Sequence, residues 1–214
     1  MKKSIIITII ATLMLAILNG CTVIRFENPL IKGEVKMHIV TNSEKLMLTQ
    51  TPNLTEKDVL KASLAKNEYE GMQFVVRSEK DIKNLSVSMT ELKNDNGEKL
   101  SFELYRQHYI EVNKTGNTDL EPGFYPDALI PIENENNSVN IKSNENQGFW
   151  ITVYADKNAT PGVYTATIKL AHDGGILETR VSVEVWNFAI PETPSFMSAF
   201  SLWFGTTWGV YEKK

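Results

Sequence analysis

Between Glu121 and Asp127 the sequence reads EPGFYPD, which places two carboxylates around two aromatic rings. Paired carboxylates can serve as general acid and base in the hydrolysis of a glycosidic bond, provided that they face each other across a pocket. The two prolines favour a different interpretation, in which this segment is a loop and Asp127 makes local backbone hydrogen bonds. We therefore assign no catalytic residue here.

Aromatic side chains offer a second kind of chemistry, because an exposed ring can stack on the apolar face of a sugar. Six rings lie in suitable segments: Tyr109, Phe124, Tyr125, Trp150, Tyr154 and Trp186. Of these, Tyr125, Trp150 and Tyr154 are the candidates for contact with a glycan. Rings in strands more often belong to a core or an interface, and this alternative stays open for all three.

The sequence argues against several other chemistries. His38, His108 and His172 lie far apart, and none has a second ligand at the spacing of a metal site. There is no Ser-His-Asp set, nucleophile elbow or Gly-rich phosphate loop, so we expect neither a metal nor a cofactor. The net charge is −4 and no Lys/Arg cluster occurs, which argues against binding to nucleic acid.

The amino terminus has the pattern of a bacterial lipoprotein signal. Two lysines precede the apolar run Ser4–Leu18, which is too short and wrongly flanked for a spanning helix. The following LNGC resembles a lipobox, so we expect removal of residues 1–20, lipidation of Cys21 and a tether over residues 21–33. This predicts an extracytoplasmic, membrane-anchored protein, with inner and outer membranes both possible. The alternative is an ordinary secretory peptide that is cleaved nearby.

Residues 34–190 are predicted to form one all-β domain. Short runs alternate apolar and polar side chains between turn residues, which favours a two-sheet antiparallel β-sandwich. The clearest strands are residues 148–154, 164–170 and 179–188. The first two flank a polar loop that ends in Pro161-Gly162, and we expect them to pair as a central hairpin.

Weaker patterns complete this prediction. Residues 67–78 read as a strand in which Gly71 marks a bulge or a close approach. Residues 133–147 are rich in Asn and Glu and read as a solvated loop around a short strand at 139–141. Residues 55–65 are compatible with one helical turn.

The chain finishes with a markedly apolar segment. After the stiff sequence PETP at 191–194, residues 195–211 include six aromatic side chains and no charge. Without a partner such a segment is prone to aggregate. We therefore expect it to begin a further domain.

Five blocks of sequence, taken in order, resemble the amino-terminal region of glycoside hydrolase family 123 and its relatives of the same architecture. The blocks are NEYEGMQF at 67–74, YPDALIP at 125–131, NQGFWI at 146–151, TPGVY at 160–164 and VWNF at 185–188. The resemblance covers roughly residues 64–203. It implies a β-sandwich followed by a (β/α)8 barrel, with the active site on the barrel.

The resemblance also implies a parent enzyme that cleaves terminal N-acetylgalactosamine or a similar 2-acetamido sugar. In that mechanism the acetamido oxygen attacks the anomeric carbon, and an adjacent Asp-Glu pair on the barrel orients it and protonates the leaving oxygen. Residues 195–214 contain no such pair, so no catalytic residue is transferred.

Residues 191–214 are accordingly expected to be a linker and the first strand of a catalytic barrel that this chain lacks. The chain is then the non-catalytic front part of a lipid-anchored hydrolase, inactive by itself. The alternatives are a surface lipoprotein that binds carbohydrate and a structural or adhesion module.

Overall fold

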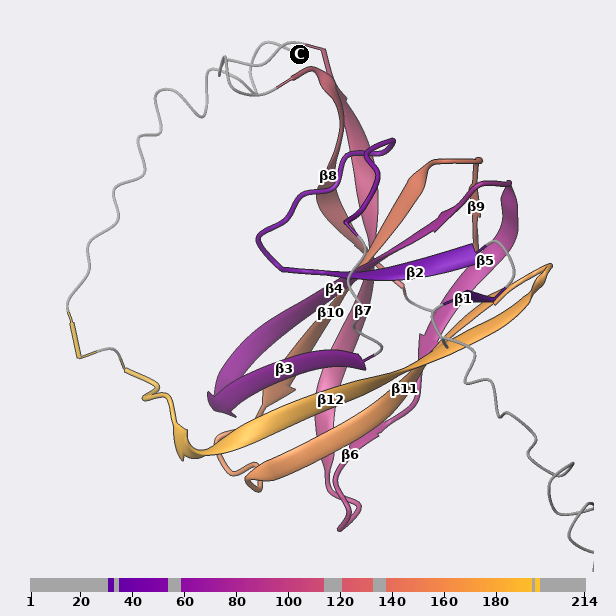
Figure 1. The fold of residues 1–214 in the computed structure, drawn as a ribbon. Helices are drawn as coiled ribbons and strands as arrows, with labels where there is room; N and C mark the ends of the chain where they lie inside the picture. Colours follow the sequence, from indigo (N-terminus) through magenta and orange to yellow (C-terminus); the bar gives the residue numbers. More distant parts are fainter. Residues whose placement is uncertain are drawn as a thin grey trace, which may run out of the picture.

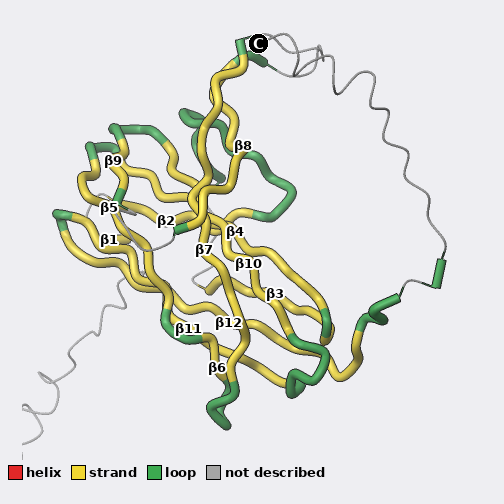
Figure 2. The backbone as a smooth tube through the Cα atoms, turned by 180° about the vertical axis from the view of Figure 1, so that it is seen from behind, coloured by secondary structure: helices red, strands yellow, loops and turns green. Residues whose placement is uncertain are grey.

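The computed structural model describes residues 31–32, 35–53, 59–113, 121–132, 138–193 and 195–196. These residues form β-strands joined by turns and loops, with no helix among them (Figure 2). The strands are β1 (Ile31–Lys32), β2 (Val35–Val40), β3 (Val59–Lys66), β4 (Glu68–Ser78), β5 (Ile82–Met89), β6 (Leu92–Lys93), β7 (Lys99–Val112), β8 (Gly123–Pro131), β9 (Val139–Ile141), β10 (Asn146–Ala155), β11 (Gly162–His172) and β12 (Gly175–Ala189).

The all-β prediction is confirmed for these residues. The helical turn considered for residues 55–65 is wrong where the structure describes it, because β3 begins at Val59. Nothing in the described part of the chain is a helix of the length and hydropathy that crossing a membrane requires. The signal peptide, Cys21 and most of the apolar carboxyl-terminal segment lie outside the described residues.

The strands form one sheet in the order β1-β2-β4-β10-β7-β6-β11-β12-β3, with β5, β8 and β9 attached beside this path. The sheet curls on itself (Figure 1). As a result the β10 layer (β1, β2, β4, β10, β7 and β8) faces the β12 layer (β3, β12, β11, β5 and β6). Every pair is antiparallel except β12 with β3, which run parallel.

The structure differs in two ways from the expected β-sandwich of two separate antiparallel sheets. Its strands form one continuous sheet, and β12 and β3 run parallel. The continuity comes from β7, whose 14 residues span about 45 Å at the usual rise per residue. Leu100 near its start pairs with Leu92 of β6, and the next residue, Ser101, pairs with Tyr154 of β10. One long strand therefore joins the two layers into a nearly closed, barrel-like sheet.

The predicted hairpin between residues 148–154 and 164–170 is wrong. β10 pairs with β4 and β7, whereas β11 pairs with β12, β5 and β6. Each strand buries one apolar face, and the two faces meet across the core instead of lying side by side in one layer. The loop 156–161 thus carries the chain from one layer to the other. Alternation identifies a strand, but it does not identify the strand's partner.

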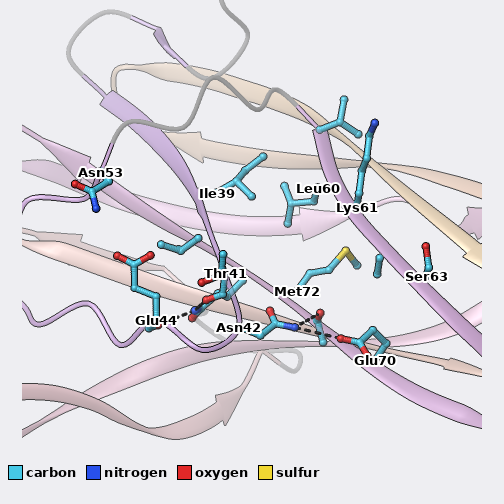
Figure 3. A pocket seen from close by; sticks show the side chains of 15 residues that line it. Ile39, Thr41, Asn42, Glu44, Asn53, Leu60, Lys61, Ser63, Glu70 and Met72 are labelled. Atoms are coloured by element: carbon cyan, nitrogen blue, oxygen red, sulfur yellow. Dashed lines mark hydrogen bonds between the residues drawn. The ribbon is translucent and has the colours of Figure 1, made fainter.

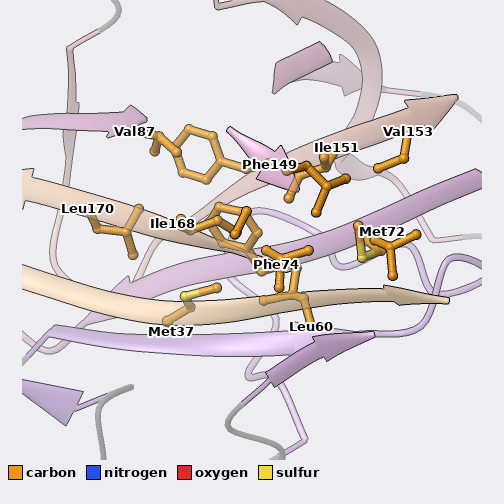
Figure 4. Packing of buried hydrophobic residues seen from close by; sticks show 14 of the residues in the cluster. Met37, Leu60, Met72, Phe74, Val87, Phe149, Ile151, Val153, Ile168 and Leu170 are labelled. Atoms are coloured by element: carbon orange, nitrogen blue, oxygen red, sulfur yellow. The ribbon is translucent and has the colours of Figure 1, made fainter. Parts of the chain in front are cut away.

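The core lies between the two layers (Figure 4). Phe74, Phe149 and Ile151 enter it from the β10 layer, and Ile168 and Val183 enter it from the β12 layer, each at most 1% exposed. The rings of Phe74 and Phe149 stack with their centroids 5.2 Å apart. Burial of these side chains is the main term that stabilises the fold.

Loop 41–53 packs on the outer face of the β10 layer. Two buried amides hold it there: Gln73 donates to two carbonyl oxygens near its start, and Asn146 donates to two near its end. Asn146 is only 1% exposed. The prediction of a solvated loop over residues 133–147 is therefore wrong at its carboxyl end, where β10 begins, although β9 occupies the position predicted for a short strand.

Candidate functional site

The two carboxylates of the EPGFYPD segment do not form a catalytic pair. Asp127 lies on β8, which pairs with β7 along most of its length, so this segment is largely strand and not the expected loop. Glu121 precedes the same strand, and its carbonyl oxygen accepts a hydrogen bond from the Tyr125 hydroxyl. Both carboxylates are exposed. Side chains on one segment in open solvent cannot act from opposite sides of a bound sugar.

The histidines are also dispersed. His38 lies on β2, His108 on β7 and His172 on β11, and no group of three potential metal ligands occurs among the described residues. Burial and the nearby cations Lys36 and Arg77 lower the pKa of His38. Both effects favour the neutral imidazole over the charged form.

Trp150 lies on the outer face of the β10 layer, where it is half buried. A Cβ atom added to Gly71 would come within 2.2 Å of the indole, so the ring lies directly over the glycine. This confirms the predicted close approach at Gly71. The indole nitrogen donates to the Thr152 hydroxyl at 3.2 Å. One face of the ring is thus occupied by the protein's own backbone.

Tyr154 belongs to the same outer face, two residues further along β10. It pairs in register with Tyr69 of β4, and their rings stack with centroids 4.3 Å apart. Its hydroxyl donates to Asn67 Oδ1 at 3.1 Å, which fixes the ring at the turn between β3 and β4. Tyr69 is 67% exposed, so the outward side of this pair faces solvent.

Tyr125 does not join this group. It pairs with Ile110 of β7, whereas Trp150 pairs with Tyr105 of the same strand. Five residues of β-strand separate these two β7 positions, which is about 17 Å. The structure therefore brings two of the three predicted glycan contacts together, adds Tyr69 to them, and leaves Tyr125 on the β7–β8 arm that projects from the body (Figure 1).

A cavity of about 700 Å³ lies between β2, β3 and β4, on the side where the curled sheet does not close (Figure 3). Ile39, Leu60 and Met72 make its apolar wall. Its polar side includes Asn42, whose amide nitrogen donates to Glu70 Oε1 at 3.2 Å and to the Gly71 carbonyl oxygen at 2.7 Å.

The other polar lining residues are Thr41, Glu44, Asn53, Lys61, Ser63 and Gln73. Amides, hydroxyls and carboxylates of this kind can hydrogen-bond a polar ligand. No pattern in the sequence predicts this cavity, because its lining comes from three strands and a loop that alternation alone does not place together.

The comparisons with known proteins agree with this fold. The family model of the glycoside hydrolase 123 N-terminal domain matches residues 48–172. Among solved structures, the chain is similar to a family 123 glycoside hydrolase from Clostridium perfringens, described for its hydrolysis of glycolipid glycans. The identity is 19% and the TM-score 0.61, over 73% of this chain and 28% of that chain.

Other solved structures are less similar. A PapD-like domain of human CEP192 has 11% identity and a TM-score of 0.35, over 78% of this chain and 97% of that one. The cupredoxin domain of amoB from Nitrosocaldus yellowstonii has 12% identity and a TM-score of 0.34, over 80% and 99%. No curated protein matches the chain. Because the family model covers more than half of its residues, the chain belongs to the glycoside hydrolase 123 N-terminal domain family.

Proposed function

We propose that this chain is the non-catalytic amino-terminal β-domain of a longer, lipid-anchored enzyme of the family 123 type. The family match over residues 48–172 is the observation that carries this proposal. The chain spans 28% of the Clostridium perfringens enzyme to which it is similar, which supports a longer parent. Residues 191–214 are then the linker and the first strand of the catalytic barrel.

The parent enzyme acts on glycans that end in N-acetylgalactosamine or a similar 2-acetamido sugar. The resemblance in sequence supports this substrate class, as does the glycolipid glycan hydrolysis for which the similar enzyme is described. The catalytic groups belong to the barrel. The exposed carboxylates of Glu121 and Asp127, which lie on one segment, and the backbone-covered Trp150 are consistent with a module that takes no part in the chemistry.

The module's physical role is to cover part of the barrel and to hold the active site away from the membrane. Cys21 carries the lipid, and residues 21–33 form the tether on an extracytoplasmic surface. Two or three acyl chains, at about 0.8 kcal/mol per buried CH₂, give stable anchoring, whereas one chain would not. A compact β-body between anchor and barrel then acts as a spacer.

The activity of the isolated chain tests this proposal. We expect the purified chain to release no product from an aryl N-acetyl-β-galactosaminide above a no-protein blank, because the proposal places the catalytic groups on the barrel. A protein that continues through the proposed barrel should hydrolyse the same substrate. Turnover by the isolated chain, or an inactive longer protein, would contradict the proposal.

A second function, glycan binding by the module, is favoured by one observation. Trp150, Tyr154 and Tyr69 lie together on the outer face of the β10 layer, and Tyr69 is 67% exposed. Titration of soluble oligosaccharides against the chain separates the two functions. Binding at millimolar or lower concentration that is lost in Tyr69→Ala would support a carbohydrate-binding module. Our proposal predicts no such binding.

A further inference from the structure

Loop 41–53 covers one part of the outer face of the β10 layer. Leu46 of this loop packs with Val40 and Val75 in a small buried apolar cluster. Further along β4 and β10, away from this cluster, the outer face reaches solvent, and Tyr69 there is 67% exposed. The chain itself therefore buries one part of an apolar face and leaves another part exposed.

Aromatic side chains gather on the exposed part. They form what we call the outer aromatic patch: Tyr69 of β4, Tyr105 of β7, and Trp150 and Tyr154 of β10. Trp150 pairs in register with Tyr105, and Tyr154 pairs with Tyr69. Residues directly opposite in antiparallel strands share a face, so the two pairs of rings lie on one surface, about 13 Å apart along β10.

The chain leaves the body at the border of this patch. The Ile190 amide donates to the Lys66 carbonyl oxygen at 2.8 Å, and Asn67 Nδ2 donates to the Ile190 carbonyl oxygen at 3.0 Å. Asn67 Oδ1 in turn accepts from the Tyr154 hydroxyl at 3.1 Å. One asparagine thus joins the exit of the chain to the outer aromatic patch, and whatever follows residue 190 starts beside these rings.

We propose that the outer aromatic patch is the surface on which the next domain of the parent protein docks. This inference rests on the part of the proposed function that places a further domain after the linker at residue 191. The fixed exit keeps such a domain beside the patch at high effective concentration. Burial of the rings then favours the contact, and aromatic side chains are enriched in the cores of protein interfaces.

The patch also indicates the chemistry of its partner surface. Glu103 and Thr152 pair with each other between the two pairs of rings. Glu103 is exposed, and its carboxylate accepts a hydrogen bond from the Tyr105 hydroxyl. A carboxylate enclosed in an interface needs a cation or a hydrogen-bond donor opposite it. We therefore expect the docked surface to place aliphatic side chains over the rings and a Lys, Arg or amide donor opposite Glu103.

A second exposed apolar region does not meet the same condition. Phe124, Leu129 and Ile130 of β8 are each at least 40% exposed. Phe124, however, pairs with Glu111 of β7, whereas Tyr154 pairs with Ser101 of that strand. Ten residues of strand separate these β7 positions, which is about 33 Å. The β7–β8 arm and the end of β12 accordingly lie at opposite ends of the body (Figure 1).

Hydroxyl-radical footprinting read by mass spectrometry tests the docking surface. Oxidation of the Tyr69 and Trp150 side chains is compared between this chain and a protein that continues through the next domain. We expect both side chains to be oxidised at least about fivefold more slowly in the longer protein, because the core of an interface excludes water. Phe124 on the arm should be oxidised at the same rate in both proteins.

The double variant Tyr69→Arg, Glu103→Arg places two cations on the patch. Both side chains are exposed, so the fold should tolerate the change. In the longer protein it should return Trp150 to the oxidation rate of the isolated chain. Phe124→Arg, Glu111→Arg is the matched control, because it makes the same change at an exposed ring and an exposed carboxylate of the arm, and it should keep Trp150 protected.

This inference and the proposed function fail in different ways. A longer protein that hydrolyses the aryl substrate while Tyr69 and Trp150 stay as reactive as in the isolated chain would overturn the docking surface alone. An inactive longer protein with protected rings would contradict the enzymatic role and support the docking. Protection that survives the double variant on the patch would overturn the inference. Protection of the isolated chain that rises with its concentration, or on adding oligosaccharide, would also overturn it, in favour of a second copy or a glycan.

Discussion

Phe149→Ala is expected to lower the free energy of unfolding by about 3–5 kcal/mol. Phe149 is 1% exposed, lies in the middle of β10 and stacks on Phe74 across the neighbouring strand. β10 has a partner on each side, so its backbone cannot shift to fill the space that the ring leaves. The truncation therefore leaves a cavity between the layers. Urea unfolding followed by circular dichroism measures the loss.

The control is Phe124→Ala, which removes the same side chain from an exposed position on β8. Because Phe124 is 41% exposed, less apolar surface returns to water, and we expect a loss below about 1 kcal/mol. The two variants should unfold with the same dependence on urea as the wild type, since neither changes the area exposed on unfolding by much. Similar losses for both would show that the β10 layer is not the centre of the core.

The strands were the most predictable part of the fold. The alternation is strict over residues 149–155 of β10 and 177–185 of β12, and the residues predicted to face inward, such as Ile151 and Val183, are fully buried. The partners of the strands were not predictable in the same way. Residues 148–154 and 164–170 are near in sequence and share the same pattern, yet they do not pair with each other. Residues 148–154 pair with β4 and β7, far away in the chain, and residues 164–170 pair with β12, which follows directly, and with β5 and β6. Pairing depends on contacts of long range, which a local pattern does not contain.

The candidate glycan contacts show a similar limit. Trp150 and Tyr154 are two residues apart in a strand, so their common face follows from the period of two. Tyr69 joins them through the register between β4 and β10, which the sequence does not state. Only its residue type makes Tyr125 a candidate glycan contact beside Trp150 and Tyr154, and the structure places it on the β7–β8 arm.

The sequence does not predict the buried side-chain amides, because polar residues in a segment rich in Asn and Glu are typical of a solvent-exposed loop. Asn146 and Gln147 end such a segment, yet both are buried at the start of β10. Gln107 belongs to the same group. Its side-chain Nε2 donates to Gln73 Oε1 at 2.9 Å, and its backbone carbonyl oxygen accepts a hydrogen bond from Gln147 Nε2 at 2.9 Å. Asn146 finds acceptors in loop 41–53, whereas Gln107 and Gln147 bond to groups of the β10 layer itself. Both arrangements are tertiary features that a local pattern does not contain.

Asn146→Ala is expected to lower the free energy of unfolding by about 2–4 kcal/mol, because it leaves two carbonyl oxygens beneath loop 41–53 without a donor. The Asn146 amide nitrogen donates to the Met47 oxygen at 2.7 Å and to the Gln50 oxygen at 2.6 Å. Its Oδ1 also accepts from Arg77 at 3.2 Å. Urea unfolding gives the overall loss, and hydrogen exchange at Leu48, whose amide donates to the Phe124 oxygen, reports on the loop.

Asn42→Ala separates burial from the number of hydrogen bonds. Asn42 also donates two hydrogen bonds, to Glu70 and Gly71, but it is exposed, so water replaces them when the side chain is removed. We expect its loss to stay below about 1 kcal/mol. Equal losses for the two variants would mean that the loop is held by its bonds irrespective of burial. A large loss confined to Asn146→Ala, with faster exchange at Leu48, would identify the buried amide as the group that fixes loop 41–53 to the β10 layer.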